Sequence, residues 1–255
     1  MTTETSAPLA IDHVSVSYKT FKNALVDANF DLKEGEIFGL IGLNGAGKTT
    51  LIKVVLDLIQ ASSGEVRCFG KSSHDIEARK NLSYLPEKFQ PPHLLKGREF
   101  LDLAVSYYGK SLDLDEARRL AAKLYLREEA VFNRIGSYSK GMGQKIGLIS
   151  SFLIDAPLYI LDEPMSGLDP KARIALKELL LEKKKDGKTA FFSSHILSDI
   201  DEICDRIGII HHGRILYIGT PGEFKQRYGN ENLEKAFLSA IDADDQTSGR
   251  QDRAA

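Results

Sequence analysis

Residues 42–49 carry the clearest chemical signal in the chain. They read Gly-Leu-Asn-Gly-Ala-Gly-Lys-Thr, which fits the pattern G-x-x-x-x-G-K-[ST]. Glycines let backbone N–H groups turn inward around phosphate oxygens, while the lysine adds a full positive charge and the threonine hydroxyl can ligate Mg²⁺. The pattern predicts nucleotide binding without specifying a reaction. The residues expected to bind the nucleotide here are Gly42, Leu43, Asn44, Gly45, Ala46, Gly47, Lys48, Thr49 and Thr50.

A pair of carboxylates, Asp162 and Glu163, follows an apolar run at 158–161. An acid at the tip of a buried parallel strand lies at the edge of the sheet where nucleotides bind. We expect Asp162 to help hold Mg²⁺. Glu163, one residue further on, faces a different direction and can take a proton from water. With the glycine loop, these acids favour a nucleotide-binding site that also performs chemistry.

The surrounding patterns predict the elements that must position these motifs. Residues 36–41 are nearly all apolar, as in a strand buried on both faces, and a helix is predicted from about Lys48 to Ile59. Alternation at 14–18 and 30–33 predicts two antiparallel strands, and residues 91–154 are helical in pattern. Further strands are predicted over 65–69, 158–161, 189–192, 207–210 and 215–218. This order favours an α/β domain with a mainly parallel sheet.

The last two strands form a hairpin that turns at His211-His212-Gly213. Two adjacent histidines can bind a metal ion, but we expect a solvated turn instead.

Cys68 and Cys204 are far apart in the sequence, so we interpret them as free thiols in a reducing compartment.

Composition limits the classes of partner. Lys+Arg number 34 and Asp+Glu 36, so the formal charge of −2 gives no electrostatic reason to expect nucleic acid. The polar start does not resemble a signal peptide, and no run of 18 apolar residues suggests a membrane span. Any work at a membrane would therefore involve another chain.

Four further segments resemble motifs of ABC ATPases, and the resemblance covers about Ile11 to Phe237. Residues 138–142, Tyr-Ser-Lys-Gly-Met, resemble the family's signature L-S-G-G-Q, and we call them the signature segment. Residues 166–169, Ser-Gly-Leu-Asp, are similar to its D-loop and end at Asp169. His195 matches the family's switch histidine, and Tyr18 stands where the family has an aromatic that stacks on adenine.

Two departures from the family pattern stand out. In the signature, Lys140 and Met142 replace the first glycine and the glutamine, and Tyr138 replaces the leucine, while Ser139 and Gly141 are kept. Glu87 stands where most members carry the glutamine of the Q-loop, and a carboxylate can still approach Mg²⁺ as an oxygen ligand. Both variants resemble those of the ATPase subunits of ABC-2-type exporters.

The resemblance implies a P-loop NTPase core with an N-terminal antiparallel β subdomain and an inserted helical subdomain. It also implies a head-to-tail dimer, with a homodimer expected, in which each copy's cleft closes on ATP against the other's signature segment. In one copy the catalytic residues would be Glu163 and His195, and the Mg²⁺ ligands Thr49, Asp162 and Glu87. The partner copy would supply Ser139, Gly141 and Met142.

We further expect a separate integral membrane permease as partner, no nucleic acid, and a cytoplasmic location on the inner face of the cell membrane through that permease. Residues 9–228 are expected to form the nucleotide-binding domain, with the helical insertion at about 91–154. A helical extension at 229–242 and a disordered tail at 243–255 are expected to follow.

Export is the favoured direction, and an importer ATPase is the nearest alternative. A soluble ABC ATPase acting on DNA or ribosomes is a weaker one, because residues 42–139 leave no room for a long coiled coil and there is one glycine loop. An ATP-binding protein without turnover is a third. The transported substance, and the choice between homodimer and heterodimer, stay open.

Overall fold

The structure is a computed structural model that describes residues 6–18 and 23–251 of the 255. Its larger sheet has the strand order β10-β9-β3-β8-β7-β6. β3 pairs in parallel with β8 and β9, and β7 pairs in parallel with β6 and β8, whereas β10 joins the edge antiparallel. The predicted mainly parallel sheet is confirmed. The strands are β3 (Ile37–Ile41), β6 (Leu82–Leu85), β7 (Leu158–Asp162), β8 (Thr189–Ser194), β9 (Arg206–His211) and β10 (Arg214–Gly219).

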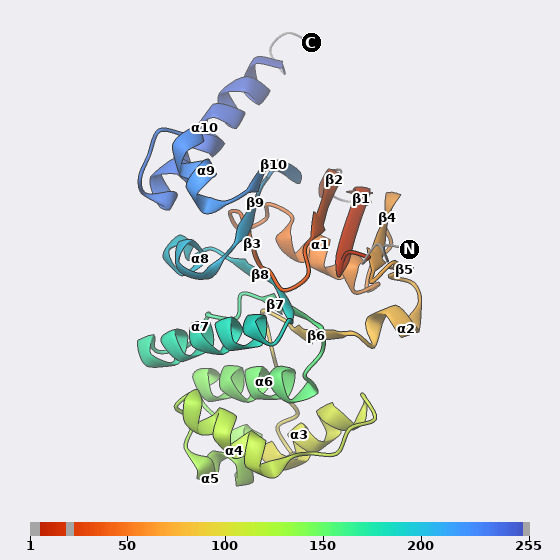
Figure 1. Cartoon of the computed structure of the whole chain (residues 1–255), viewed down its shortest axis with the longest axis vertical. Coiled ribbons are helices and arrows are strands. Elements are labelled where there is room, and N and C mark those ends of the chain that lie inside the picture. The colour runs from red at the N-terminus through yellow and green to blue at the C-terminus, as the bar shows by residue number, and fades with distance from the viewer. Residues whose placement is uncertain (1–5, 19–22, 252–255) are drawn as a thin grey trace.

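A second sheet, of order β2-β1-β4-β5, is antiparallel and is built from the N-terminal part of the chain. It stands beside the larger sheet, with α1 close to both (Figure 1). The antiparallel pairing predicted for the first two strands is confirmed. The strands are β1 (Leu9–Val16), β2 (Leu25–Leu32), β4 (Ser63–Cys68) and β5 (Lys71–Ser72).

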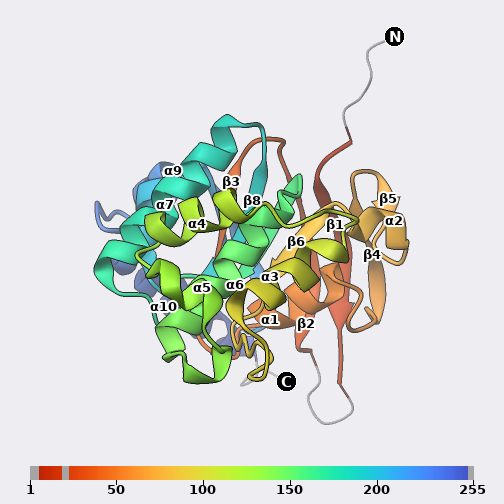
Figure 2. The same ribbon diagram turned by 90° about the horizontal axis from the view of Figure 1, so that it is seen from below.

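Helices cover the other face of the larger sheet. α7 and α6 form successive layers beneath it, and α3, α4 and α5 gather below α6 as the predicted helical block (Figures 1 and 2). Of the helices in the described part of the chain, none combines the length and apolarity that a bilayer crossing requires. The helices are α1 (Lys48–Val55), α2 (Ile76–Arg79), α3 (Gly97–Ser106), α4 (Leu114–Lys123), α5 (Glu128–Phe132), α6 (Lys140–Ile154), α7 (Pro170–Lys185), α8 (Leu197–Ile203), α9 (Pro221–Arg227) and α10 (Leu233–Gln251), with a 3₁₀ turn at Ile135–Ser137.

The larger sheet is buried on both faces, and this packing holds in place the strand ends that carry the residues of the site. Side chains alternate along β3. Ile37 and Ile41 belong to the core formed with the helical side, whereas Phe38 and Leu40 belong to the core shared with α1 and the antiparallel sheet. An unbroken apolar run is what such a two-sided burial requires.

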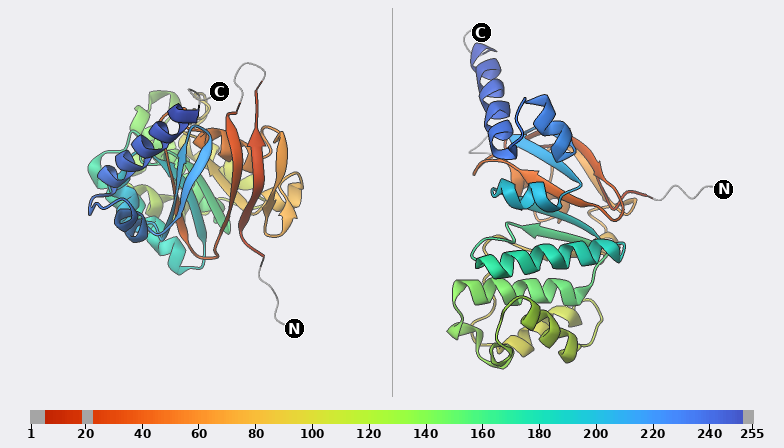
Figure 3. Two further views of the ribbon diagram at one scale, coloured as in Figure 1. Left: turned by 90° about the horizontal axis from the view of Figure 1, so that it is seen from above. Right: turned by 60° about the vertical axis from the view of Figure 1, so that its left-hand side comes forward.

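Two helix ends differ from the predictions. α1 stops at Val55 instead of Ile59, because Leu56 leaves the helix and Asp57 adopts a left-handed backbone with φ 57°. Residues 243–251, expected to be disordered, continue α10 as helix (Figure 3). Phe237 and Ile241 pack into the core and hold the start of α10, and extending an established helix needs little further stabilisation. Residues 252–255 lie outside the described part.

The hairpin of β9 and β10 turns at His211-His212-Gly213 as predicted. The expectation that both histidines are solvated is wrong for His211, which is 4% exposed. Its Nε2 lies 2.8 Å from Oδ1 of Asp245 on α10, a partner 34 residues away that the local sequence could not indicate.

Candidate active site

The glycine loop at 42–47 connects β3 to α1, as the motif predicted. Gly45 and Gly47 have φ values of 83° and 114°, which favour glycine. A Cβ at Gly42 would lie 2.6 Å from the carbonyl oxygen of Ile210, so the loop passes too close to β9 for a side chain. The N–H of Gly213 donates to the carbonyl of Ala46 at 2.9 Å, which braces the loop from the hairpin turn.

Lys48 brings a buried positive charge to this loop. Its side chain is 7% exposed, and Nζ donates to the carbonyl of Gly42 at 2.7 Å. Nζ also lies 3.7 Å from Oε1 of Glu163. The ammonium group is therefore held beside the first turn of α1, where the helix dipole adds to its attraction for phosphate.

Asp162 ends β7 and is 1% exposed. It accepts hydrogen bonds from the hydroxyls of Thr49, at 3.1 Å, and Ser193. Burial raises the pKa of Asp162, and the two hydroxyl bonds act in the opposite direction by favouring its charged form. The nearby charge of Glu87 adds to the rise in this pKa. The site thus brings together several oxygen atoms that could ligate a metal ion, and oxygen is the ligand type that Mg²⁺ prefers.

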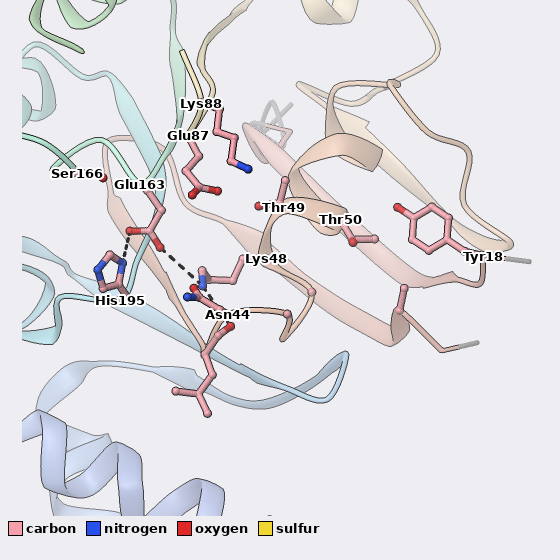
Figure 4. Close-up of a pocket in the computed structure, with 14 residues that line it drawn as sticks. Tyr18, Asn44, Lys48, Thr49, Thr50, Glu87, Lys88, Glu163, Ser166 and His195 are labelled. Atoms are coloured by element: carbon pink, nitrogen blue, oxygen red, sulfur yellow. Dashed lines mark hydrogen bonds and ion pairs between the residues drawn. The ribbon is translucent and has the colours of Figure 1, made fainter. Parts of the chain in front are cut away.

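Glu163 turns away from Asp162 because its backbone is left-handed, with φ 50°. Such a backbone is uncommon outside glycine and concentrates at functional sites. Its N–H donates to the hydroxyl of Ser193 at 3.0 Å. Its Oε2 lies 2.7 Å from Nδ1 of His195, so the carboxylate stands between His195 and Lys48 (Figure 4).

Lys48, Thr49 and Glu163 open onto a cleft of about 510 Å³, whereas Asp162 is buried and is not among its lining residues. Tyr18 lines its far end, beyond Thr50, and Glu87 lines the side opposite Lys48 (Figure 4). Of the predicted loop residues, Gly42 and Ala46 lie behind the surface of the cleft. The lining residues are Tyr18, Ala24, Leu43, Asn44, Gly45, Gly47, Lys48, Thr49, Thr50, Glu87, Lys88, Glu163, Ser166 and His195.

The signature segment does not line this cleft. Ser139 caps α6, with its hydroxyl accepting from the N–H of Met142 at 3.3 Å. A Cβ at Gly141 would lie 2.9 Å from the carbonyl oxygen of Gly167, so the signature segment packs against the D-loop. Asp169 closes that loop and caps α7. The structure therefore brings the predicted signature residues next to the D-loop and leaves them outside their own cleft.

Three contacting residues were not identified from the sequence. Lys145 of α6 donates to Asp169 at 2.8 Å, and this bond holds the pKa of Asp169 below its usual range. Gln144, also on α6, donates to the carbonyl of Pro164 at 3.2 Å. Ser193 donates to the carboxylate of Asp162 and accepts from the backbone N–H of Glu163. Lys145 is a lysine on an otherwise apolar helix face, and this pattern could have indicated a buried ion pair. Ser193 had no comparable signal beyond its place near the end of a strand.

The glycine loop on a parallel sheet, its buried lysine and the two acids at the tip of β7 define a P-loop nucleotide-binding protein. Residues 25–166 match the family described as ABC transporter, a span of more than half the chain. The chain therefore belongs to the ABC transporter family, and its curated relatives are ATP-binding proteins of that family.

Three relatives illustrate the similarity. An uncharacterized ABC transporter ATP-binding protein of Synechocystis is 41% identical over 75% of this chain, which spans only 55% of that relative's length. The ABC-type transporter ATP-binding protein EcsA of Bacillus subtilis is 36% identical over 86% of this chain and 91% of its own. The doxorubicin resistance ATP-binding protein DrrA of Mycobacterium tuberculosis is 32% identical over 83% of this chain and 65% of its own.

Solved structures give the same result for the fold. An ATP-binding subunit of an ABC transporter superimposes with a TM-score of 0.85 at 34% identity, over 91% of this chain and 99% of that one. A dimeric ATP-binding cassette in a post-hydrolysis state with ADP and Pi has a TM-score of 0.73 at 22% identity, over 83% of this chain and 98% of that one. The predicted fold class and family resemblance are confirmed.

Proposed function

We propose that this chain binds and hydrolyses ATP as one subunit of a head-to-tail dimer that drives a separate membrane permease in the direction of export. The observation that carries the hydrolysis step is the position of Glu163. Its carboxylate stands between Nζ of Lys48 and Nδ1 of His195 inside the cleft. A base held there can accept a proton from a water molecule that attacks the terminal phosphate.

The oxygen donors around Thr49 and Asp162 fit Mg²⁺, and Glu87 on the facing wall is the third proposed ligand. Bound Mg²⁺ would supply charge neutralisation at the phosphates. Glu87 brings a full negative charge where a glutamine would bring none. Lys48 offsets that charge across the cleft, and Tyr18 offers an aromatic face to adenine at the end of the cleft.

The placement of the signature segment supports the dimer. Ser139 is exposed and caps a 15-residue helix, whose first N–H groups favour an anion. No residue of this segment lines its own cleft. A second copy related by a two-fold axis can present Ser139, Gly141 and Met142 to that cleft, as suits the dimeric assembly of one solved neighbour.

The names of the relatives support a transporter that exports. DrrA is a doxorubicin resistance protein, and this chain resembles it over most of the described residues. The departures at Lys140, Met142 and Glu87 also resemble exporter subunits. In this proposal the chain lies on the cytoplasmic side of the cell membrane, attached to its inner face through the permease.

Glu163→Gln tests the hydrolysis step. The amide keeps the size of the side chain and removes the base, so phosphate release should fall about 100-fold or more while ATP binding is retained. Release is measured with purified chain and Mg-ATP, and binding with a fluorescent ATP analogue. Glu178→Gln, which changes an exposed acid on α7 in the same way, is the matched control and should leave both unchanged. A Glu163→Gln chain with an undiminished rate would remove Glu163 from this role.

A further inference from the structure

The turn of the β9–β10 hairpin meets α10 through three potential metal ligands. Nε2 of His211 and Nε2 of His212 lie 2.8 and 3.2 Å from the same oxygen, Oδ1 of Asp245. The two imidazole rings are themselves close, with centroids 3.9 Å apart. One carboxylate oxygen thus faces two ring nitrogens that come from adjacent positions of a hairpin.

The backbone of the turn explains why both rings face the same way. His212 and Gly213 have φ values of 45° and 76°, the left-handed pair that a two-residue type I′ turn requires. His211 therefore ends β9 directly before the turn, and His212 occupies its first corner. The rings converge on α10 although adjacent side chains of an extended strand point to opposite faces.

Asp245 is brought to this place by the docking of α10. Ala240 and Ile241 of this helix are buried in the core. Residues four apart share a helix face, so Asp245 follows Ile241 on the side that meets the body of the protein. The Asp245 side chain is 54% exposed and that of His212 is 70% exposed, whereas the His211 side chain is 5% exposed. One potential ligand is fixed by packing, and the other two are open to solvent.

Two imidazole nitrogens and one carboxylate oxygen form a donor set that suits divalent transition metals such as Zn²⁺. Around a tetrahedral Zn²⁺ with bonds of about 2.0–2.1 Å, neighbouring ligand atoms lie about 3.3 Å apart. To reach that spacing, the distance from His211 to Asp245 needs to open from 2.8 Å by about 0.5 Å and that from His212 from 3.2 Å by about 0.1 Å. Water can complete the fourth position on the exposed side.

Other histidines on the surface lack this arrangement. His74 pairs with Asp57 at 2.6 Å, and His13 pairs with Asp27 at 2.7 Å. Within residues 6–18 and 23–251, the group at the hairpin turn is the single cluster of three His, Cys, Asp or Glu side chains whose ligand atoms all lie within 4.8 Å of one another.

We propose that His211, His212 and Asp245 bind a divalent transition-metal ion of the Zn²⁺ class, which ties α10 to the hairpin turn. The turn is also joined to the nucleotide loop, because the N–H of Gly213 donates to the carbonyl of Ala46 at 2.9 Å. An ion at this site would therefore link the C-terminal helix to the support of the glycine loop. The proposal goes beyond the ATPase function and does not depend on it.

The test is a titration of the metal-free full chain with Zn²⁺, using a purification tag without histidines and no nucleotide or Mg²⁺. We expect calorimetry to show saturable uptake of one ion per chain. His212→Asn keeps a residue that tolerates the left-handed backbone, and Asp245→Asn keeps the size of the side chain. Each should weaken Zn²⁺ binding at least ten-fold, because loss of a direct ligand should cost no less than loss of a supporting contact.

His74→Ala is the matched control, since it removes a histidine that also pairs with an acid on the surface, and it should keep the affinity of the unaltered chain. Circular dichroism shows whether the variants fold. A second readout is hydrogen exchange over residues 242–247, which Zn²⁺ should slow in the unaltered chain and not in Asp245→Asn. Absence of uptake, equal uptake by the variants, or unchanged exchange in the unaltered chain would each overturn the proposal.

Discussion

The nucleotide cleft and the signature segment use their polar groups differently. In and directly behind the cleft, Lys48, Asp162 and Glu163 are each at most 7% exposed, and all have partners within the chain. In the signature segment, Ser139 is exposed and contacts only its own helix turn among the hydrogen bonds of the described residues. The polar groups of the cleft are therefore held within one chain, whereas the signature segment is exposed and lies outside its own cleft. Under the proposed dimer, one chain is enough to bind the nucleotide, and turnover requires a second chain.

A mixture of two defective chains tests whether the signature segment completes its neighbour's cleft, and it has the largest expected effect. Lys48→Ala removes the charge in the cleft, and Ser139→Ala removes the signature hydroxyl, so each variant alone should lose activity about 100-fold or more. In a heterodimer of the two, both defects meet at one site and the other site is intact. An equal mixture should recover up to about a quarter of the normal phosphate release, because half the dimers keep one of two sites.

Two controls make the mixing result interpretable. Native mass spectrometry should show that heterodimers form, and each variant mixed with itself should stay inactive. If heterodimers are present and activity does not return, the signature segment does not complete its neighbour's cleft. Undiminished turnover by the unaltered chain at a dilution where it is monomeric would show that one chain completes its own site.

Lys145→Met acts at the D-loop, which lies between the two regions: Ser166 lines the cleft, and Gly167 lies against Gly141. The side chain of Lys145 is 8% exposed and fixes Asp169, so its loss should loosen the signature helix against the D-loop. We expect turnover to fall roughly ten-fold with ATP binding unchanged. The free energy of unfolding should fall by about 1 kcal/mol, less than for a buried charged pair because the Asp169 side chain is 51% exposed.

Denaturant unfolding and steady-state phosphate release measure these two effects. Adding Lys145→Met to a chain that already carries Asp169→Ala should cause little further loss, since the shared bond is gone. Fully additive losses would show that Lys145 acts through some other contact.

The smallest effect is expected at the rim of the cleft. Tyr18→Ala should raise the KM for ATP a few-fold and leave kcat nearly unchanged, because stacking on adenine holds substrate and transition state equally. Tyr107→Ala is the control, since Tyr107 is 79% exposed and does not line the cleft. Equal KM values for Tyr18→Ala and the unaltered chain would refute the stacking assignment.

Much of the fold could be predicted because its signals are local. The unbroken apolar run of β3 and the alternation in β1 and β2 each predict a strand without knowledge of the rest. The same is true of the glycine loop, whose residue types report the backbone that they adopt. The placement of Lys48, Asp162 and Glu163 followed once these elements were known.

The parts that were missed depend on contacts between distant segments. Residues 243–251 are polar, and their helix follows from the docking of Phe237 and Ile241. The bond from Lys145 to Asp169 joins residues 24 apart, and the bonds of Ser193 to the Asp162 carboxylate and to the backbone N–H of Glu163 join residues about 30 apart. Neither contact has a periodic signal, so the sequence could not show which residues are paired.

The hydrogen bond from Gly213 to Ala46 has a consequence for how the protein is made. Gly213 follows Ala46 by 167 positions, so the glycine loop leaves the ribosome long before its brace exists. At about 5–20 residues per second, this interval is roughly 8–33 s. During synthesis the nascent chain thus carries an unfinished phosphate site, and a truncation anywhere before the second hairpin strand leaves it unfinished permanently.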